Sequence, residues 1–90
     1  MKRYPIPDFA YFLAELHVAQ SKPDFAQKEL AALVTARPNV PEYRLALGNV
    51  YDKLGRYQEA RLSYEKALEL SPSNQEAKRK VIEYYARREK

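Results

Sequence analysis

The sequence predicts an all-α protein of five helices, and two observations lead to this class. No segment alternates apolar and polar residues with the period of two that a half-buried strand requires. The chain also repeats itself at an interval of 34 residues, which is typical of stacked helical hairpins. Small residues match small ones and large apolar residues match large ones. The matched pairs are Leu47 with Leu13, Gly48 with Ala14, Ala60 with Ala26, Tyr64 with Leu30, Ala67 with Leu33 and Pro72 with Pro38.

The first two helices are expected between Pro7 and Pro38. The first begins at Pro7-Asp8, because apolar residues follow at helical spacing. It ends before Pro23, because a proline disfavours the helical conformation of the residue that precedes it. The spacing of Asp24 and Gln27 is that of a capping box, which predicts the start of the second helix. That helix ends ahead of Pro38.

The other three helices follow from similar signals. Pro41 suits the first turn of the third helix, where its missing N–H costs nothing. Gly55 can adopt the left-handed conformation that closes this helix. The fourth helix is expected from about Gln58 to Leu70. Ser73-x2-Glu76 forms a second capping box and predicts the start of the fifth helix.

The unit from Leu47 to Pro72 resembles the tetratricopeptide repeat. It contains Leu47-Gly48-x2-Tyr51, Ala60-x3-Tyr64 and Pro72, where the family signature has Leu-Gly-x2-Tyr, Ala-x3-Phe and Pro. Arg44 stands in the place of the signature's opening Trp. The resemblance covers roughly residues 7 to 90 and implies a single domain over residues 1–90, a helical-hairpin repeat solenoid. Its parts are a hairpin at 7–40, a hairpin at 41–74 and a capping helix at 75–90.

The resemblance also implies how the helices pack. Gly48 is expected where the third helix meets its neighbour, within one buried group formed by Leu47, Tyr51, Ala60, Tyr64 and Ala67. The first hairpin departs from the signature, since Ser21 and Pro23 replace Gly55 and Tyr57. Its turn is therefore expected to differ in shape.

The array is short for a solenoid. About three repeats are usually needed to bury a continuous core, and this chain has two and one further helix. Three possibilities remain open at this point. The fifth helix is an effective cap, the chain pairs with itself or with a partner, or the chain is a piece of a longer protein.

The formal net charge of +4 lies entirely at one end of the chain, because residues 1–77 carry ten basic and ten acidic residues. The last helix is then either a solvated cap, as terminal repeats require, or a positive wall for an acidic partner. Nucleic acid is not expected as a partner, because the basic residues do not extend over several repeats.

Tetratricopeptide arrays use the first helix of each hairpin to line a concave groove, and the resemblance places that groove here. We expect partner contacts from Tyr11, Phe12, Glu15, Leu45, Asn49, Lys53, Arg79, Lys80, Glu83 and Arg87. The wider stripe adds Asp8, Val18, Ala19, Glu42, Ala46, Asp52 and Glu76. The groove floor is expected to run from apolar and acidic at the N-terminal end to basic at the C-terminal end. Asn49 either holds the backbone of a bound peptide or is a polar residue that faces water.

One family subtype binds the acidic C-termini of heat-shock chaperones through a clamp of lysine, arginine and asparagine side chains. The clamp positions hold Tyr11, Glu15, Ala46, Glu76 and Lys80 in this chain, and only Lys80 fits. We therefore expect no chaperone-tail clamp.

The sequence offers no candidate catalytic or metal site and no cofactor motif, so we expect no enzyme. The chain has no cysteine, and its single histidine, His17, is expected to pack in the core or between helices. No apolar run approaches the roughly 20 residues of a membrane span, and the residues after Met1 are not expected to form a signal peptide, because Pro5, Pro7, Asp8 and Glu15 interrupt the apolar stretch. These features favour a cytoplasmic protein.

Two functions remain. The first is an adaptor or scaffold module that binds a peptide or helical segment of a partner protein, which the basic helix suggests is acidic. The alternative is a structural role in weak self-association, without a separate peptide ligand. Exposure of Tyr4, Ile6, Tyr84 and Tyr85 would favour this alternative, since apolar residues at the end of a short solenoid promote stacking.

Overall fold

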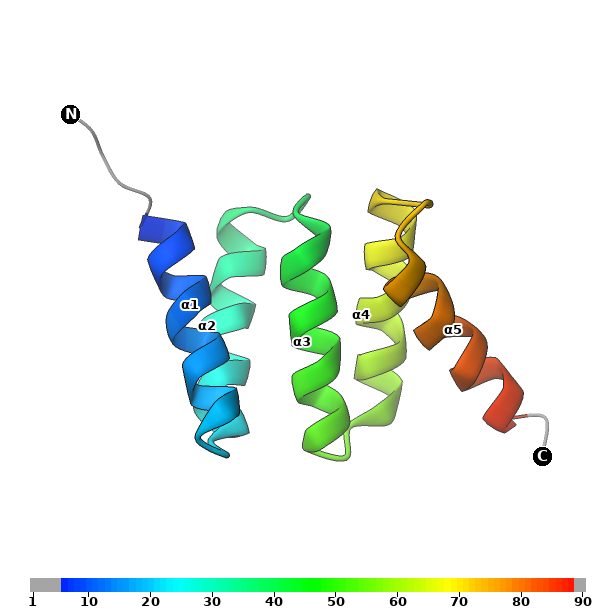
Figure 1. Cartoon of the computed structure of the whole chain (residues 1–90), viewed down its shortest axis with the longest axis horizontal. Helices are drawn as coiled ribbons and strands as arrows, with labels where there is room; N and C mark the ends of the chain where they lie inside the picture. Colours follow the sequence, from blue (N-terminus) through cyan, green and yellow to red (C-terminus); the bar gives the residue numbers. More distant parts are fainter. Residues whose placement is uncertain (1–5, 89–90) are drawn as a thin grey trace.

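The computed structural model describes residues 6–88 and contains five α-helices and no strand within that range. The helices are α1 (Ile6–Ala19), α2 (Pro23–Ala36), α3 (Pro41–Lys53), α4 (Tyr57–Leu70) and α5 (Gln75–Arg88) (Figure 1). The all-α architecture of five helices predicted from the sequence is confirmed. None of these helices is long and apolar enough to cross a membrane.

The helices form two layers in an elongated molecule of 52 × 28 × 18 Å. α1, α3 and α5 lie in the front layer of Figure 1, and α2 and α4 lie behind them. Each helix packs against the next one along the chain, and α1 also contacts α3. The chain therefore forms two antiparallel hairpins, α1–α2 and α3–α4, with α5 packed on the outer side of α4.

The core consists of two clusters on opposite sides of α3. The first is centred on Leu30 and Val50 and joins α1, α2 and α3. The second is centred on Tyr64 and joins α3, α4 and α5. The prediction of one buried group was wrong, because Leu47 belongs to the first cluster and the half-buried Tyr51 packs against both. The reason is that α3 presents one side to α2 and another to α4.

The turns of the two hairpins have the same shape, so the expected difference between them was wrong. Ser21 adopts φ 61° and Gly55 adopts φ 78°. The Ser21 N–H donates to Val18 O, and the Gly55 N–H donates to Asp52 O at the equivalent place. The left-handed conformation is uncommon for serine and has a modest energetic cost. Packing of the two helices of the hairpin offsets this cost.

Neither predicted capping box is present among the hydrogen bonds of the described residues. α2 begins at Pro23 after Lys22, and no side chain caps it, so Asp24 lies inside the first turn. Proline stabilises that first position through its fixed φ. α5 begins at Gln75, and the Oδ1 of Asn74 accepts a hydrogen bond from the Ala77 N–H at 3.0 Å. Asparagine is as good an N-cap as serine, and here it replaces the predicted Ser73.

His17 lies between the helices of the first hairpin, as predicted. Its Nδ1 is 2.8 Å from Oε1 of Glu29 on α2. At the other end of the molecule, Tyr84 is buried against α4 whereas Tyr85 is half exposed. Tyr4 lies outside the described residues, as does the side chain of Ile6.

Candidate peptide-binding groove

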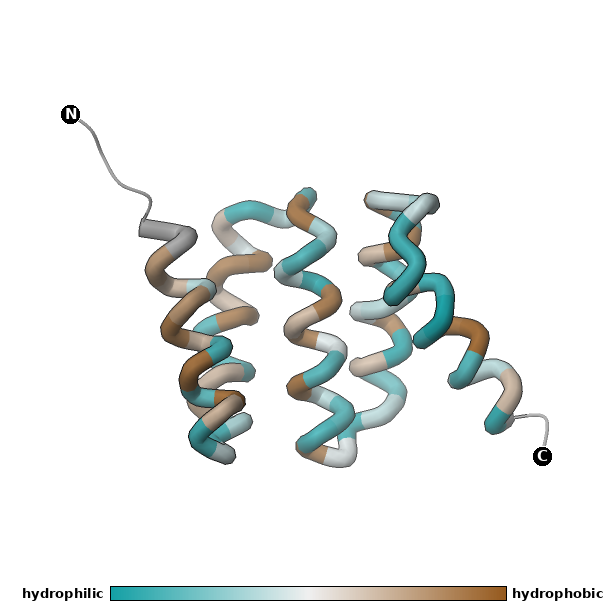
Figure 2. The backbone as a smooth tube through the Cα atoms, viewed as in Figure 1, coloured by the Kyte–Doolittle hydropathy of each residue, from teal (hydrophilic) through white to brown (hydrophobic). Residues whose placement is uncertain are grey.

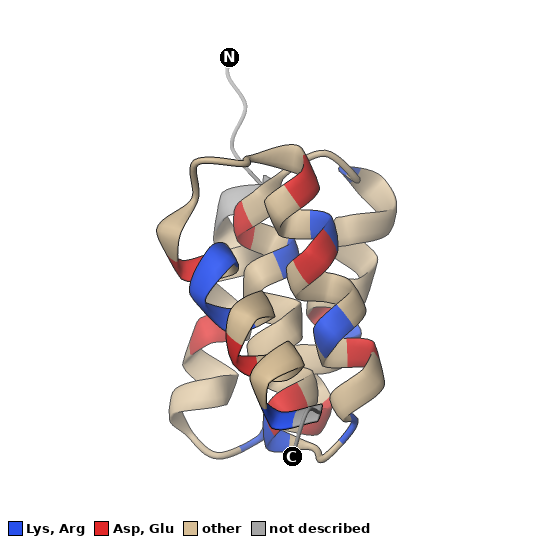
Figure 3. Ribbon diagram, turned by 90° about the vertical axis from the view of Figure 1, so that its right-hand side faces the viewer, with Lys and Arg blue, Asp and Glu red and all other residues tan. Residues whose placement is uncertain are grey.

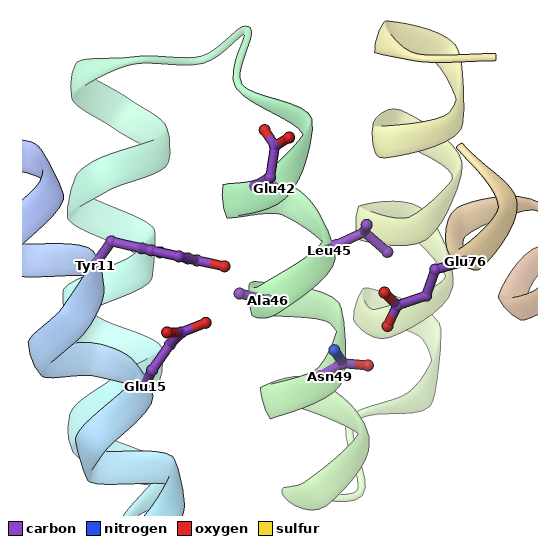
Figure 4. Close-up of a pocket in the computed structure, with 7 residues that line it drawn as sticks. All are labelled: Tyr11, Glu15, Glu42, Leu45, Ala46, Asn49 and Glu76. Atoms are coloured by element: carbon purple, nitrogen blue, oxygen red, sulfur yellow. The ribbon is translucent and has the colours of Figure 1, made fainter. Parts of the chain in front are cut away.

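Three adjoining hollows lie along the layer formed by α1, α3 and α5, and every residue that lines them belongs to one of these three helices. The first hollow has a volume of about 270 Å³ and is shown in Figure 4. It is lined by Tyr11, Glu15, Glu42, Leu45, Ala46, Asn49 and Glu76. The second and third have volumes of about 210 and 470 Å³ and continue towards the C-terminal end of α3. Together the hollows form one groove that crosses all three units of the repeat.

Asn49 is the one residue that borders all three hollows. Its Oδ1 accepts a hydrogen bond of 2.7 Å from the hydroxyl of Tyr64, which is itself fully buried. The single proton of this hydroxyl is shared with Oδ2 of Asp52 at 3.0 Å, and the contact places the amide oxygen of Asn49 on the side of Tyr64. The two N–H donors of the Asn49 amide are on the opposite side of the group (Figure 4). Asn49 is thus held as a hydrogen-bond donor at the centre of the groove.

The first hollow is acidic. Glu15, Glu42 and Glu76 come from three different helices and line this hollow together with Tyr11 (Figure 4). Among the described residues, none of the three carboxylates is within ion-pair distance of a lysine or arginine. Burial, a hydrogen bond with Glu15 and the negative charges of Glu15, Glu42 and Glu76 together raise the pKa of Tyr11 to about 12. The phenol is therefore neutral at physiological pH and keeps a proton that it can donate to a carboxylate.

The third hollow contains the cations of the groove, Lys53 and Lys80. The ammonium group of Lys80 lies 5.7 Å from the centre of the Tyr64 ring, a distance at which cation–π attraction operates. Asp52 also borders this hollow, but its carboxylate accepts hydrogen bonds from the hydroxyls of Tyr64, at 3.0 Å, and Tyr84. The groove thus changes from acidic to mixed charge along its length.

The two bonds to Asp52 connect three helices, since Asp52 lies on α3, Tyr64 on α4 and Tyr84 on α5. Burial raises the pKa of both tyrosines above the ordinary value, and the hydrogen bonds to Asp52 raise it further. This network fixes the position of α5 against the second hairpin, and α5 in turn forms one wall of the groove.

Six of the ten residues predicted to contact a partner line these hollows, namely Tyr11, Glu15, Leu45, Asn49, Lys53 and Lys80. The other four, Phe12, Arg79, Glu83 and Arg87, are exposed but do not line a hollow. The guanidinium of Arg87 instead lies over the ring of Tyr84, at 5.5 Å from its centre.

The predicted change from an acidic to a basic floor is only partly present, because Glu76 on α5 contributes the third carboxylate of the first hollow. A signal for this exists in the sequence. Asp8, Glu42 and Glu76 follow one another at exactly one repeat length, so the same position of the repeat is acidic in all three units. Val50 is the one lining residue outside the expected stripe, and it reaches the second hollow from the side of α3 that packs on α2.

The described residues contain no group of three or more side chains that could hold a metal ion. A groove that runs across a scaffold of stacked helical hairpins is typical of binding modules built from helical repeats. The sequence comparisons agree with this class. A family model described as Tetratricopeptide repeat matches residues 6–75, and the chain belongs to the tetratricopeptide repeat family.

Solved structures with the same fold include three tetratricopeptide-type chains. The first domain of Spaghetti (RPAP3), bound to the HSP90 peptide SRMEEVD, superposes with a TM-score of 0.85 at 21% identity, over 93% of this chain and 67% of that one. A point mutant of MamA gives 0.79 at 31% identity, over 92% of this chain and 61% of that one. A repeat protein of Salinibacter ruber gives 0.75 at 22% identity, over 94% and 97%. No curated protein sequence matches this chain significantly.

Proposed function

We propose that this protein is an adaptor or scaffold module that binds a short segment of a partner protein along the groove of α1, α3 and α5. The observation that carries the proposal is the position of Asn49, whose amide donors lie at the centre of three adjoining hollows while Tyr64 holds its oxygen. An oriented donor of this kind suits a backbone carbonyl of a bound peptide, because peptide carbonyls are strong acceptors at regular spacing.

The charges along the groove favour a segment with both signs of charge. A basic side chain fits the first hollow, beside Glu15, Glu42 and Glu76. An acidic side chain fits the third hollow, beside Lys53 and Lys80. The basic last helix suggested an acidic partner. The charges of the groove favour acidic residues of the partner only at its C-terminal end, beside Lys53 and Lys80. Complementary charges of this kind fix the direction of the segment and select against wrong partners.

The likeness to the HSP90-bound domain supports the use of this groove for a peptide, but not the same ligand. The identity is 21%, so the likeness concerns the fold. In addition, Glu15 and Glu76 occupy positions where a chaperone-tail clamp has polar or cationic side chains. A peptide whose acidic residues lay along the whole groove would meet these carboxylates and be repelled.

Selection from a random-peptide phage library against the immobilised chain tests the proposal. The expected result is an enriched motif with a basic and an acidic residue, whose synthetic peptide binds the wild type and binds an Asn49→Ala variant at least several-fold more weakly. Lys28→Ala on α2, an exposed residue outside the groove, is the matched control and should bind like the wild type. Failure to enrich any motif, or binding that is unchanged in Asn49→Ala, would contradict the proposal.

A further inference from the structure

The N-terminal end of the molecule carries an apolar helix face that no other helix covers. Phe9, Phe12 and Leu16 on α1 are 65%, 59% and 40% exposed. Their spacing places them on one side of the helix. Figure 2 shows the apolar residues of α1 at this end of the array. Terminal repeats of a solenoid normally have a polar outer face, so this face departs from the rule.

The internal repeat shows that the equivalent face of α3 is buried. A shift of one repeat length places Phe9 on Tyr43 and Leu16 on Val50. These two residues of α3 are only 5% and 1% exposed, because α2 covers them. The exposed face of α1 is therefore equivalent to the face of α3 that α2 covers. In α1 this face lies at the end of the array, where no preceding helix covers it.

The C-terminal end carries a second uncovered face. Ile82 and Tyr85 on α5 are 59% and 49% exposed. The same shift, taken backwards, places them on Gly48 and Tyr51, which meet α4 in the second hairpin. Each end of the molecule thus presents an apolar helix face whose equivalent on α3 is packed, against α2 in one case and against α4 in the other.

The two end helices also have opposite charge. The sequence of α1 contains two acidic residues, Asp8 and Glu15, and no lysine or arginine. The sequence of α5 contains two acidic and five basic residues, the latter being Lys78, Arg79, Lys80, Arg87 and Arg88. Figure 3 views the molecule from the α5 end and shows the charged residues there. Because the two helices lie at opposite ends of the long axis, one copy can present α5 to α1 of another (Figure 1).

We propose that copies of this chain associate head to tail, with the Ile82 and Tyr85 face of α5 in one copy packed against the Phe9 and Leu16 face of α1 in the next. Pairing of like ends is disfavoured, since it would bring together two acidic or two basic helices. A head-to-tail contact uses different surfaces on the two copies, so it leaves a free end at each side and extends into a chain. The groove of α1, α3 and α5 is a separate surface, and this assembly would place the grooves of successive copies in line.

Sedimentation velocity of the full chain at increasing concentration, with variants blocked at one end, tests the proposal. Phe9→Lys places a cation opposite the basic α5, and Ile82→Glu places an anion opposite the acidic α1. Both residues are exposed, so the fold should persist, which circular dichroism verifies. Leu62→Lys, at a residue of α4 that is 57% exposed and belongs to neither face, is the matched control.

The wild type and Leu62→Lys should grow in mass with concentration, and each end-blocked variant should remain monomeric. A mixture of Phe9→Lys and Ile82→Glu should associate, because the first variant keeps an intact α5 face and the second an intact α1 face. A wild type that remains monomeric up to millimolar concentration would overturn the proposal. So would self-association of either blocked variant alone, which would indicate pairing of like ends. If one variant unfolds, Leu16→Lys or Tyr85→Glu blocks the same end.

Discussion

A Cβ atom added to Gly48 would lie 2.6 Å from Cε1 of Tyr64, closer than real side chains approach. The absence of a side chain at position 48 allows α3 to pack directly on the ring of the fully buried Tyr64. Alanine normally stabilises a helix interior relative to glycine by about 0.5–1 kcal/mol. At this site the overlap should dominate, so we predict that Gly48→Ala lowers the free energy of unfolding by about 1–3 kcal/mol, measured by urea denaturation.

The first repeat provides the control for this prediction, because Ala14 and Leu30 occupy the equivalent positions. In a Tyr64→Leu background the space that alanine needs is available. The cost of Gly48→Ala should then be much smaller, although Tyr64→Leu has its own cost from lost hydrogen bonds. An equal cost in both backgrounds would show that the contact with Tyr64 does not exclude alanine.

The bonds of Tyr64 and Tyr84 to Asp52 predict a loss of stability at alkaline pH. Their folded-state pKa values are raised, whereas an unfolded tyrosine has a pKa of about 10. Above about pH 10 the unfolded chain releases protons that the folded chain retains. The stabilisation is therefore complete below that pH and is lost as the pH rises. Thermal unfolding measured between about pH 9 and pH 11 should show a falling midpoint.

Asp52→Asn separates this effect from other groups that titrate at alkaline pH. Without the negative charge, the pKa values of the two tyrosines should move towards the ordinary value, and the midpoint should fall less steeply with pH. The variant should also lose about 1–3 kcal/mol at neutral pH, because two hydrogen bonds to a charged group are weakened. A pH dependence as steep as that of the wild type would argue against the role of Asp52.

The N-cap of α5 gives a third prediction. Asn74→Ala removes the acceptor of the Ala77 N–H and should cost about 1 kcal/mol of unfolding free energy. Ser73→Ala, at the neighbouring residue that the capping-box pattern had indicated, should cost much less. The reverse order would show that Ser73 caps the helix in solution. Both values come from the same chemical denaturation experiment.

The charge pattern of the groove predicts that charge reversals at its two ends weaken contacts with different residues of the peptide. For a peptide selected by the groove, Lys53→Glu with Lys80→Glu should weaken contact with the acidic residue. Glu42→Lys should weaken contact with the basic residue. Each exposed charge contributes on the order of 1 kcal/mol or less, and the losses should shrink as salt is added. Matching reversals in the peptide should restore binding, and losses that no peptide reversal restores would contradict the proposed charge pairing.

Most of the fold could be predicted from the sequence, because helix boundaries and the repeat depend on local signals. Pro41 and Gly55 occupy the places that their backbone preferences predict, and Gly48 lies at the crossing of α3 and α4. The cap of α5 was misplaced by one residue, since Ser73 and Asn74 could each serve as the cap, and α2 begins after Lys22 without the side-chain cap that was predicted at Asp24. The shape of the Ser21 turn was misjudged because packing of the hairpin outweighs the preference of a single residue.

The groove was harder to predict because its charge depends on which side chains converge. The family pattern places a residue on the concave side, but it does not show that Glu76 approaches Glu15 and Glu42 across two helix gaps. It also does not show that Tyr64 holds the amide of Asn49, or that Arg87 lies over Tyr84 instead of lining the groove. The positions of Glu76 and Arg87 depend on how α5 packs against the second hairpin, which the hydrogen bonds of Asp52 help to determine.

Mapping of amide chemical shifts by NMR, during titration with a peptide selected by the chain, is the most direct test of the central claim. The account predicts that the perturbed amides lie on the groove side of α1, α3 and α5, with Glu15, Asn49 and Lys80 among the largest changes. Amides of exposed residues of α2 and α4, such as Lys28 and Leu62, should change little. Perturbations confined to α2 and α4, or to the end faces at Phe9 and Ile82, would show that the groove is not the binding surface.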